Sequence, residues 1–346
     1  MKTYSIIDIL FCLLLCIISC TPSDDTMDTA FPGGEGIFIV NEGNFMAGNG
    51  SVSFYSFDSR KVYDDVFSRV NGRPLGDVPN SMVISGKKGF IVVNNSGKIE
   101  VVEINSMKSV GSITNLNSPR QMLVINDTKA YVSSLYSTKL YVINTESYSV
   151  SGQIEIRRSS EAILMKDNLA FVSCWSGGNE IIVINTLNDS VIDSIKVGQE
   201  PESMAFDKNG KLWVLCSGGY TGEYYPEIDM INTSTRRIEK IFKFDSNKLY
   251  PYSLCINSSG DTLYYIAKYV WELPVMSLQL PSEPLIKDSG RTYYKINAGP
   301  SDGRLYITNA VDYQQRGYLL MAGRNGEIID SVRVGIIPGA MCFKVE

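Results

Sequence analysis

The sequence has no histidine among its 346 residues. Without imidazole, Ser-His-Asp and Cys-His catalytic arrangements and histidine-ligated metal sites are excluded, which leaves carboxylates, Lys, Tyr and Arg as candidate acids and bases. It also has no Gly-rich phosphate-binding loop and no Cys-x-x-Cys pattern. We therefore expect a protein that is not an enzyme and that needs neither a cofactor nor a metal ion.

The sequence also lacks an excess of basic residues, with 32 Lys and Arg against 37 Asp and Glu. The formal net charge is -5 and the isoelectric point is near 5.1. Binding to the phosphate backbone of nucleic acids needs an excess of Lys and Arg, so nucleic acid is not an expected partner. The four cysteines beyond residue 20 fall at equivalent positions of a repeat described below, which favours small core residues over a disulfide framework or a zinc site: Cys174, Cys216, Cys255 and Cys342.

One long apolar run stands at the N-terminus, from Ile6 to Ser19 after Lys2. It is too short for a spanning helix and is typical of an export signal. Its end, Ile17 to Cys20, resembles a bacterial lipobox, in which the cysteine is lipidated after cleavage; the alternative is an ordinary cysteine in a secretory signal.

The residues that follow Cys20 resemble the acidic tag that sends some lipoproteins to the outer leaflet, because Ser23 is followed by Asp24 and Asp25; the alternative is a plain solvated linker. We predict a signal peptide at 1–19, a lipidated flexible linker at 20–35, and one domain at 36–346. The expected location is the cell outer membrane, lipid-anchored and exposed at the surface.

The domain is built from repeats. A strand, a tight turn, a second strand, a loop and a third strand recur along the chain, as in 201–232. The aromatic residue of each second strand recurs every 40 to 52 residues: Phe38, Phe90, Tyr131, Phe171, Trp213, Tyr264 and Tyr306. This period is the length of a four-stranded propeller blade. The sequence therefore predicts an all-β, seven-bladed β-propeller of four-stranded antiparallel blades.

The two ends of the domain complement each other. Phe38 lies in a second strand that has no first strand before it, whereas 338–345 matches a first strand with nothing after it. We expect Met341 to Val345 to pair into the first blade and close the ring, which removes open sheet edges.

Antiparallel topology places two sets of residues on the same face of the propeller. The chain enters each first strand on the face where the second-to-third strand loops also emerge. We predict that this face binds a ligand. Candidate residues where first strands begin, close to the axis, are Asn80, Arg120, Glu161, Glu202, Tyr252 and Thr292. Candidates in the surrounding loops are Asn44, Phe45, Asn95, Tyr136, Trp175, Tyr220, Tyr269, Trp271 and Tyr313.

Several of these candidates also have an interpretation that involves no ligand. Glu161 and Glu202 suit a glycosidase-type carboxylate pair, but polar channel lining balanced by Arg120 is favoured, because the sequence does not fix the carboxyl separation. About half of the loop aromatics are expected to be structural packing. On the opposite face, Asp and Asn clusters favour turns over calcium sites, because they lack the spaced ligands of a binding loop.

The motif Asn41-Glu-Gly-Asn, the Tyr-Val-Ile-Asn strands, the Pro-x-x-Met first strands and the leader together resemble the YncE-like seven-bladed propeller family, in its surface-lipoprotein branch, over 36–346. BtuG-type proteins of that branch capture cobalamin (vitamin B12) and pass it to a TonB-dependent outer-membrane transporter. The resemblance implies these two partners here, with a membrane contact through the lipid anchor. The alternative is a non-catalytic propeller that binds proteins or glycans in a surface nutrient-uptake complex.

Overall fold

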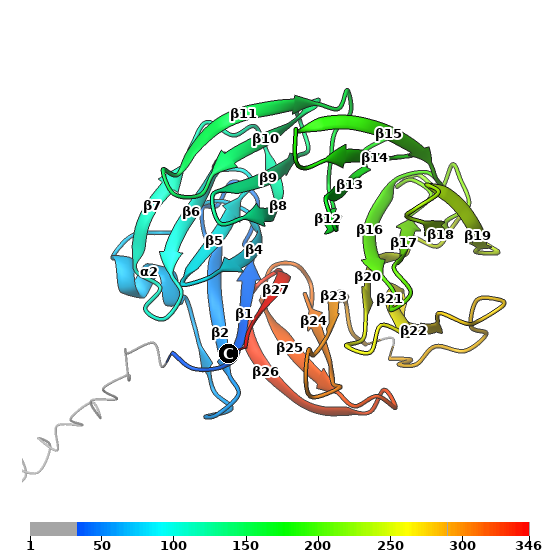
Figure 1. The fold of residues 1–346 in the computed structure, drawn as a ribbon. Helices are drawn as coiled ribbons and strands as arrows, with labels where there is room; N and C mark the ends of the chain where they lie inside the picture. The colour runs from blue at the N-terminus through cyan, green and yellow to red at the C-terminus, as the bar shows by residue number, and fades with distance from the viewer. Residues whose placement is uncertain (1–32, 289, 346) are drawn as a thin grey trace, which may run out of the picture. The chain divides into compact units, whose positions relative to one another are not determined.

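The structure is a computed structural model that describes residues 33–288 and 290–345. These residues form seven antiparallel sheets that are arranged as blades around a common axis (Figure 1). The predicted fold class, an all-β seven-bladed propeller, is therefore confirmed. The predicted signal peptide, the lipidated Cys20 and the linker up to residue 32 lie outside the described residues.

Four strand positions recur in the blades, counted outward from the axis. The first strands are β27 (Pro338–Lys344), β4 (Pro79–Ser85), β8 (Pro119–Asn126), β12 (Ile163–Lys166), β16 (Pro201–Phe206), β20 (Tyr252–Ile256) and β23 (Tyr293–Ala298). The second strands are β1 (Gly36–Asn41), β5 (Lys88–Val93), β9 (Lys129–Ser134), β13 (Leu169–Cys174), β17 (Lys211–Cys216), β21 (Thr262–Ala267) and β24 (Leu305–Asn309).

The third and fourth strands complete the blades. The third strands are β2 (Ser51–Ser56), β6 (Lys98–Glu103), β10 (Lys139–Asn144), β14 (Glu180–Asn185), β18 (Glu227–Asn232), β22 (Tyr269–Pro274) and β25 (Arg316–Ala322). The fourth strands are β3 (Val62–Tyr63), β7 (Ser109–Ile113), β11 (Ser149–Glu155), β15 (Ser190–Lys196), β19 (Arg237–Lys243) and β26 (Ile328–Ile336). In blade six a single bridge between Val270 and Ile286 stands in place of a fourth strand.

The ring closes as the sequence predicts. Strand β27 pairs antiparallel with β1, and Met341 lies opposite Ile39 while Phe343 lies opposite Ile37. The first strands also contact one another in a complete cycle, from β27 through β4, β8, β12, β16, β20 and β23 back to β27. Blade one therefore combines the two ends of the domain, and its first strand is the last strand of the chain (Figure 1).

Each pair of neighbouring blades encloses its own apolar core. Second strands are almost continuously apolar because neighbouring blades cover both of their faces, and the predicted aromatic of every second strand is buried. Phe38, for example, packs with Ile91 of the next blade, and Trp213 packs with Leu263. The four cysteines beyond residue 20 are free thiols, two of them buried and two partly buried.

The enlarged first repeat contains a short helix. Helix α2 (Val66–Asn71) follows β3, starts after the cap residue Asp65 and ends at Gly72. Its Val66 and Phe67 are buried in the core between blades one and two. None of the helices formed by the described residues is long and apolar enough to cross a membrane.

Candidate ligand-binding site at the propeller axis

The first strands begin with a sharp backbone turn that directs a side chain to the axis. In four blades the residue before the first proline has a left-handed backbone, with φ between 46° and 54°: Val78, Ser118, Glu200 and Ile337. This conformation is unfavourable for residues with a Cβ and persists only where the surroundings enforce it. Here the carbonyl of Val78 accepts a hydrogen bond from Asn94 N–H at 2.8 Å, and the other three carbonyls are held in the same way.

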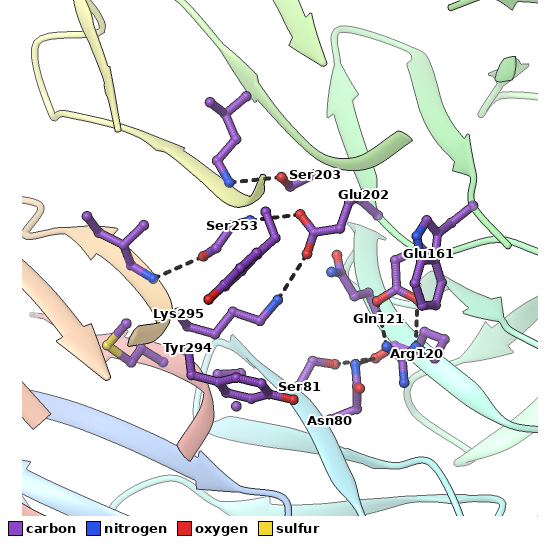
Figure 2. A pocket seen from close by; sticks show the side chains of 18 of the residues that line it. Asn80, Ser81, Arg120, Gln121, Glu161, Glu202, Ser203, Ser253, Tyr294 and Lys295 are labelled. Carbon is purple, nitrogen blue, oxygen red and sulfur yellow. Dashed lines mark hydrogen bonds and ion pairs between the residues drawn. The ribbon is translucent and has the colours of Figure 1, made fainter. Parts of the chain in front are cut away.

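A β-bulge follows this turn. Pro79 pairs with Val93 and Ser81 with Val92, so Asn80 is left between two pairs of the ladder. Because a bulge re-aims the side chain of the extra residue, Asn80 and its equivalents point to the axis. The structure brings them together in a cavity of about 590 Å³ that opens among the second-to-third strand loops (Figure 2).

An Arg–Glu pair stands on one side of the cavity. Arg120 Nε lies 2.6 Å from Glu161 Oε2, and Arg120 Nη2 lies 2.9 Å from Oε1, a bidentate geometry that adds direction as well as strength. The backbone carbonyl of Arg120 accepts hydrogen bonds from Asn80 Nδ2 and the Ser81 hydroxyl. Its guanidinium lies 5.9 Å from the centre of the Trp175 ring. Hydrogen bonds to its backbone and the bidentate contact with Glu161 therefore hold Arg120 in place (Figure 2).

A second ion pair bridges over blade six. Lys295 Nζ, from blade seven, lies 3.2 Å from Glu202 Oε1, from blade five, and Ser253 N–H of blade six donates to Glu202 Oε2 at 2.8 Å. Burial alone raises the pKa of Glu202, but Lys295 and hydrogen bonds from Ser203 and Ser253 bring it below its ordinary value.

The third carboxylate of the cavity comes from outside the first strands. Glu42 follows β1, and both of its carboxylate oxygens lie within 3.2 Å of the Tyr294 hydroxyl. Burial raises the pKa of Glu42, although Lys295 and Arg120 oppose this rise. A Cβ on Gly339 would stand 2.2 Å from Glu42 Oε1. Gly339, the axial residue of blade one, therefore leaves the space that the Glu42 side chain occupies.

Aromatic side chains line the mouth of the cavity. Tyr220 packs edge-on against Tyr250 with ring centres 6.1 Å apart, and Tyr250 packs against Tyr252 at 6.5 Å. Tyr313 packs edge-on against Tyr294 at 5.8 Å on another side. Trp175 Nε1 is buried and has no hydrogen-bond partner among the described residues. The mouth thus combines flat apolar faces with polar tips, which suits an amphipathic ligand.

The structure brings eight of the predicted residues together in this cavity. They are Asn80, Arg120, Glu161, Trp175, Glu202, Tyr220, Tyr252 and Tyr313. Four others lie in loops on the same face but outside the cavity lining. Asn44 Nδ2 donates to the backbone carbonyl of Tyr313, Asn95 Nδ2 donates to Asp77, and Phe45 and Tyr136 are 70% and 73% exposed.

Three predicted positions differ from the structure. Tyr269 and Trp271 are not loop residues, because Lys268 alone, with φ 63°, makes the turn and both aromatics lie in β22. Trp271 stacks on Tyr265 at 6.4 Å and donates Nε1–H to the Ala267 carbonyl, so it packs between blades five and six. Thr292 is not the axial residue of blade seven, since its hydroxyl donates to the Val311 carbonyl and it lies outside the cavity.

The sequence analysis missed several cavity residues, among them the charged residues Glu42 and Lys295 and the tyrosines Tyr250 and Tyr294. Blade seven has no proline at the start of β23. Tyr293 takes that position, because it pairs with Asn309 as Pro79 pairs with Val93 and the same bulge follows. The axial residues of this blade are therefore Tyr294 and Lys295, two and three positions after Thr292. Aligning Tyr293 with the proline that begins the first strand in other repeats would have identified these two residues.

Comparisons with known proteins place the chain in a family and in a fold. A family model described as "Domain of unknown function (DUF5074)" matches residues 35–299. No curated protein sequence matches the chain. Among solved structures, a quinonprotein alcohol dehydrogenase-like protein from Bacteroides thetaiotaomicron is similar, with a TM-score of 0.70, 13% identity, and coverage of 91% of this chain and 79% of that one.

Two further solved structures are enzymes by their names. The periplasmic gluconolactonase of Pseudomonas aeruginosa has a TM-score of 0.65 and 12% identity, covering 90% of this chain and 99% of that one. Virginiamycin B lyase from Staphylococcus aureus has a TM-score of 0.59 and 13% identity, covering 73% and 83%. At such identities the likeness shows the propeller fold alone, and it neither assigns nor excludes an enzymatic role.

Proposed function

The chain belongs to the DUF5074 family, and we propose that it is a surface-anchored capture protein that binds cobalamin at the axial cavity and delivers it to a TonB-dependent transporter. The observation that carries the proposal is the cavity of about 590 Å³ itself. Its mouth carries aromatic side chains, and its axial part, which we call the polar neck, is lined by Asn80, Arg120, Gln121, Glu161, Glu202 and Lys295. Binding sites for small molecules combine such apolar faces with a few convergent polar groups. The choice of cobalamin rests on the resemblance to YncE-like lipoproteins.

The size of the cavity suggests how such a ligand is held. A volume of about 590 Å³ lies in the range of pockets for drug-sized molecules, whereas a corrin with its side arms is larger. The corrin ring would therefore lie across the mouth, against Trp175, Tyr220 and Tyr313. Its amide arms would reach the polar neck, where Asn80 and Gln121 offer matching donors and acceptors.

The lipid anchor is compatible with delivery to a transporter in the same membrane. Strand β1 begins at Gly36, next to Lys344, on the face opposite the cavity. The chain from Cys20 to Gly36 can reach at most about 55 Å if fully extended. We therefore propose that an anchor at Cys20 keeps the propeller within this distance of the membrane that holds the transporter.

Isothermal titration calorimetry tests the proposal. We expect residues 33–346 to give saturable heat with cobalamin and cobinamide at micromolar concentration; no heat with either would overturn the ligand assignment and leave the propeller in place. Tyr220→Ala should weaken binding by up to about tenfold, since one lost aromatic contact is worth about 0.5–1.5 kcal/mol. Tyr136→Ala is the matched control, because it is an exposed loop tyrosine outside the cavity.

A specific observation favours a second function, docking to a protein or glycan partner. Four aromatic side chains on the cavity face lie outside the lining and are at least half exposed: Phe45, Tyr136, Tyr224 and Tyr225. Such residues are enriched at interfaces. A chromosomal neighbourhood of cobalamin genes supports the first function, whereas polysaccharide-degradation genes support this one.

The proposed role is non-catalytic. Glu161 and Glu202, the candidate carboxylate pair of a glycosidase, are each ion-paired with a cation, and the pKa of Glu202 is lowered, so it holds no proton to donate at neutral pH. A glycosidase or lyase role would be supported if the protein turned over a glycan and the Glu161→Gln/Glu202→Gln double variant lost that turnover.

A further inference from the structure

We propose that the axial cavity selects uncharged groups rich in amides or hydroxyls and rejects anions, because a carboxylate already occupies each cation that lines it. This inference rests on the proposed function, since it names the chemistry of the ligand that the same cavity binds. It concerns the part of the ligand that enters the neck. Corrin amides and neutral sugar hydroxyls both fit this description, whereas carboxylates and phosphates do not.

The charges of the lining are the first support. Among the described residues, the side chains that line the cavity include two cations, Arg120 and Lys295, and three carboxylates, Glu42, Glu161 and Glu202. The formal sum is −1 with Glu42 ionised and zero with Glu42 protonated, the form that its burial favours. In neither state does the lining carry an excess of cations, so no net positive charge attracts an anion into the cavity.

The pairing of the cations is the second support. Arg120 uses Nε and Nη2 on Glu161, and Lys295 points its Nζ at Glu202 (Figure 2). An anionic ligand group would have to displace a protein carboxylate from one of these pairs and leave it buried without a partner. Leaving a buried charge unpaired is among the most costly changes in a protein.

The neutral polar groups are the third support. Asn80, Gln121, Asn297 and the tyrosine hydroxyls at the mouth line the same cavity and can both donate and accept. A primary amide or a hydroxyl matches such groups without a change in charge. The neck therefore has hydrogen-bonding partners for neutral polar groups, whereas both cations that the described residues contribute to it, Arg120 and Lys295, are already ion-paired.

The quenching of Trp175 fluorescence tests whether the cavity rejects anions, which we call the charge rule. This test does not require the ligand to be known. Trp175 lines the cavity and lies against Arg120. Each quenching constant is divided by that of free N-acetyltryptophanamide, because iodide is intrinsically a more efficient quencher than caesium. On this scale we expect acrylamide, a neutral amide, and caesium to quench Trp175, and iodide to quench it several-fold less than caesium. The Trp175→Phe variant fluoresces only from the other two tryptophans, Trp213 and Trp271. Its signal is subtracted from that of the wild type, so that the difference is the quenching of Trp175.

The Glu161→Gln variant should admit anions to the cavity. The change frees the guanidinium of Arg120 beside Trp175, so iodide quenching should rise several-fold while acrylamide quenching stays unchanged. Glu239→Gln is the matched control, because Glu239 is an ion-paired glutamate on β19, away from the cavity. Iodide quenching of wild-type Trp175 equal to that by caesium, or no rise in Glu161→Gln, would overturn the inference.

A ligand series separates this inference from the proposed function. Cobalamin should bind at least about tenfold more tightly than its derivative in which one side-chain amide is a carboxylate, since one unit of unfavourable charge in a buried site is worth a factor of this order. A neutral oligosaccharide and its uronic acid counterpart form the second pair. Absence of binding in all four titrations contradicts the capture function alone, whereas equal or tighter binding of the carboxylates contradicts the charge rule.

Discussion

Asp229 offers a sharp test of the electrostatics of this fold. It lies in the middle of β18 and is completely buried. Its Oδ2 accepts a hydrogen bond from Gly198 N–H at 3.0 Å, but its Oδ1 has no donor among the described residues. Burial, and next the charge of Glu227, raises the pKa of Asp229 from 3.8 to about 7. We predict that Asp229→Asn stabilises the protein at neutral and alkaline pH.

The sign follows from the two protonation states. The folded protein keeps the proton on Asp229 up to about pH 7, whereas the unfolded chain releases it near pH 4. The carboxyl therefore destabilises the fold increasingly as pH rises between these values, and the full cost remains above them. A shift of about 3 pKa units corresponds to on the order of 4 kcal/mol. Asparagine is neutral throughout and avoids this cost.

Urea unfolding followed by tryptophan fluorescence measures the effect. The free energy of unfolding of Asp229→Asn minus that of the wild type should rise by about 3 kcal/mol between about pH 5 and about pH 8. Using the pH dependence of this difference removes any constant effect of the amide on packing. A difference that stays flat over this range would refute the assignment of a neutral buried carboxyl.

Glu100 is the matched control for Asp229. It holds the same position in blade two, opposite Ile91 as Asp229 is opposite Val214, and it is also buried. Burial alone raises the pKa of Glu100, but hydrogen bonds from Arg73, Lys98 and Ser109 bring it below its ordinary value. Its ionised form therefore stabilises the fold, and this contribution is lost as pH falls through the folded-state pKa. Glu100→Gln should accordingly destabilise the protein at neutral pH and less so in acid.

Three further predictions concern the axis and the ring. Lys295→Met should cost about 3–5 kcal/mol of stability in denaturant unfolding by leaving Glu202 buried without its cation, and adding Glu202→Gln should recover much of the loss; an additive double variant would contradict the pairing. Gly339→Ala should displace Glu42 and lower ligand affinity in calorimetry with little change in melting temperature; unchanged affinity would remove Glu42 from the site. Trp271→Ala should lower stability by up to about 3 kcal/mol and leave affinity unchanged, because the ring packs between blades; weaker binding at unchanged stability would return it to the site.

The repeat and the closure of the ring could be read from the sequence because their signals are local. Apolar runs such as 211–216 and the turns around them specify each strand by its own residues, and the unmatched strands at the two ends of the domain specify the closure. About half of the predicted residues line the cavity by the same logic, since antiparallel topology fixes which residues reach the axis. Asn80, Arg120 and Glu161 are examples.

The remaining site residues depend on departures from the repeat. Lys295 reaches Glu202 over blade six, which no spacing in the sequence reveals, and Glu42 fills a place that exists because Gly339 has no side chain. The loop of blade six shrinks to Lys268, which moved Trp271 from a predicted loop into a strand. Each of these features depends on how a blade or loop departs from the common repeat and contacts its neighbours in space. The sequence pattern of a single blade does not contain this information.

A crystal structure of residues 33–346 grown with cobalamin tests the central claim most directly. The account predicts ligand density over the axial cavity, with the corrin against Trp175 and Tyr220 and a neutral arm between the Arg120–Glu161 and Lys295–Glu202 pairs, both of them intact. Density on the opposite face of the propeller, or a ligand carboxylate that has displaced Glu161 from Arg120, would contradict it.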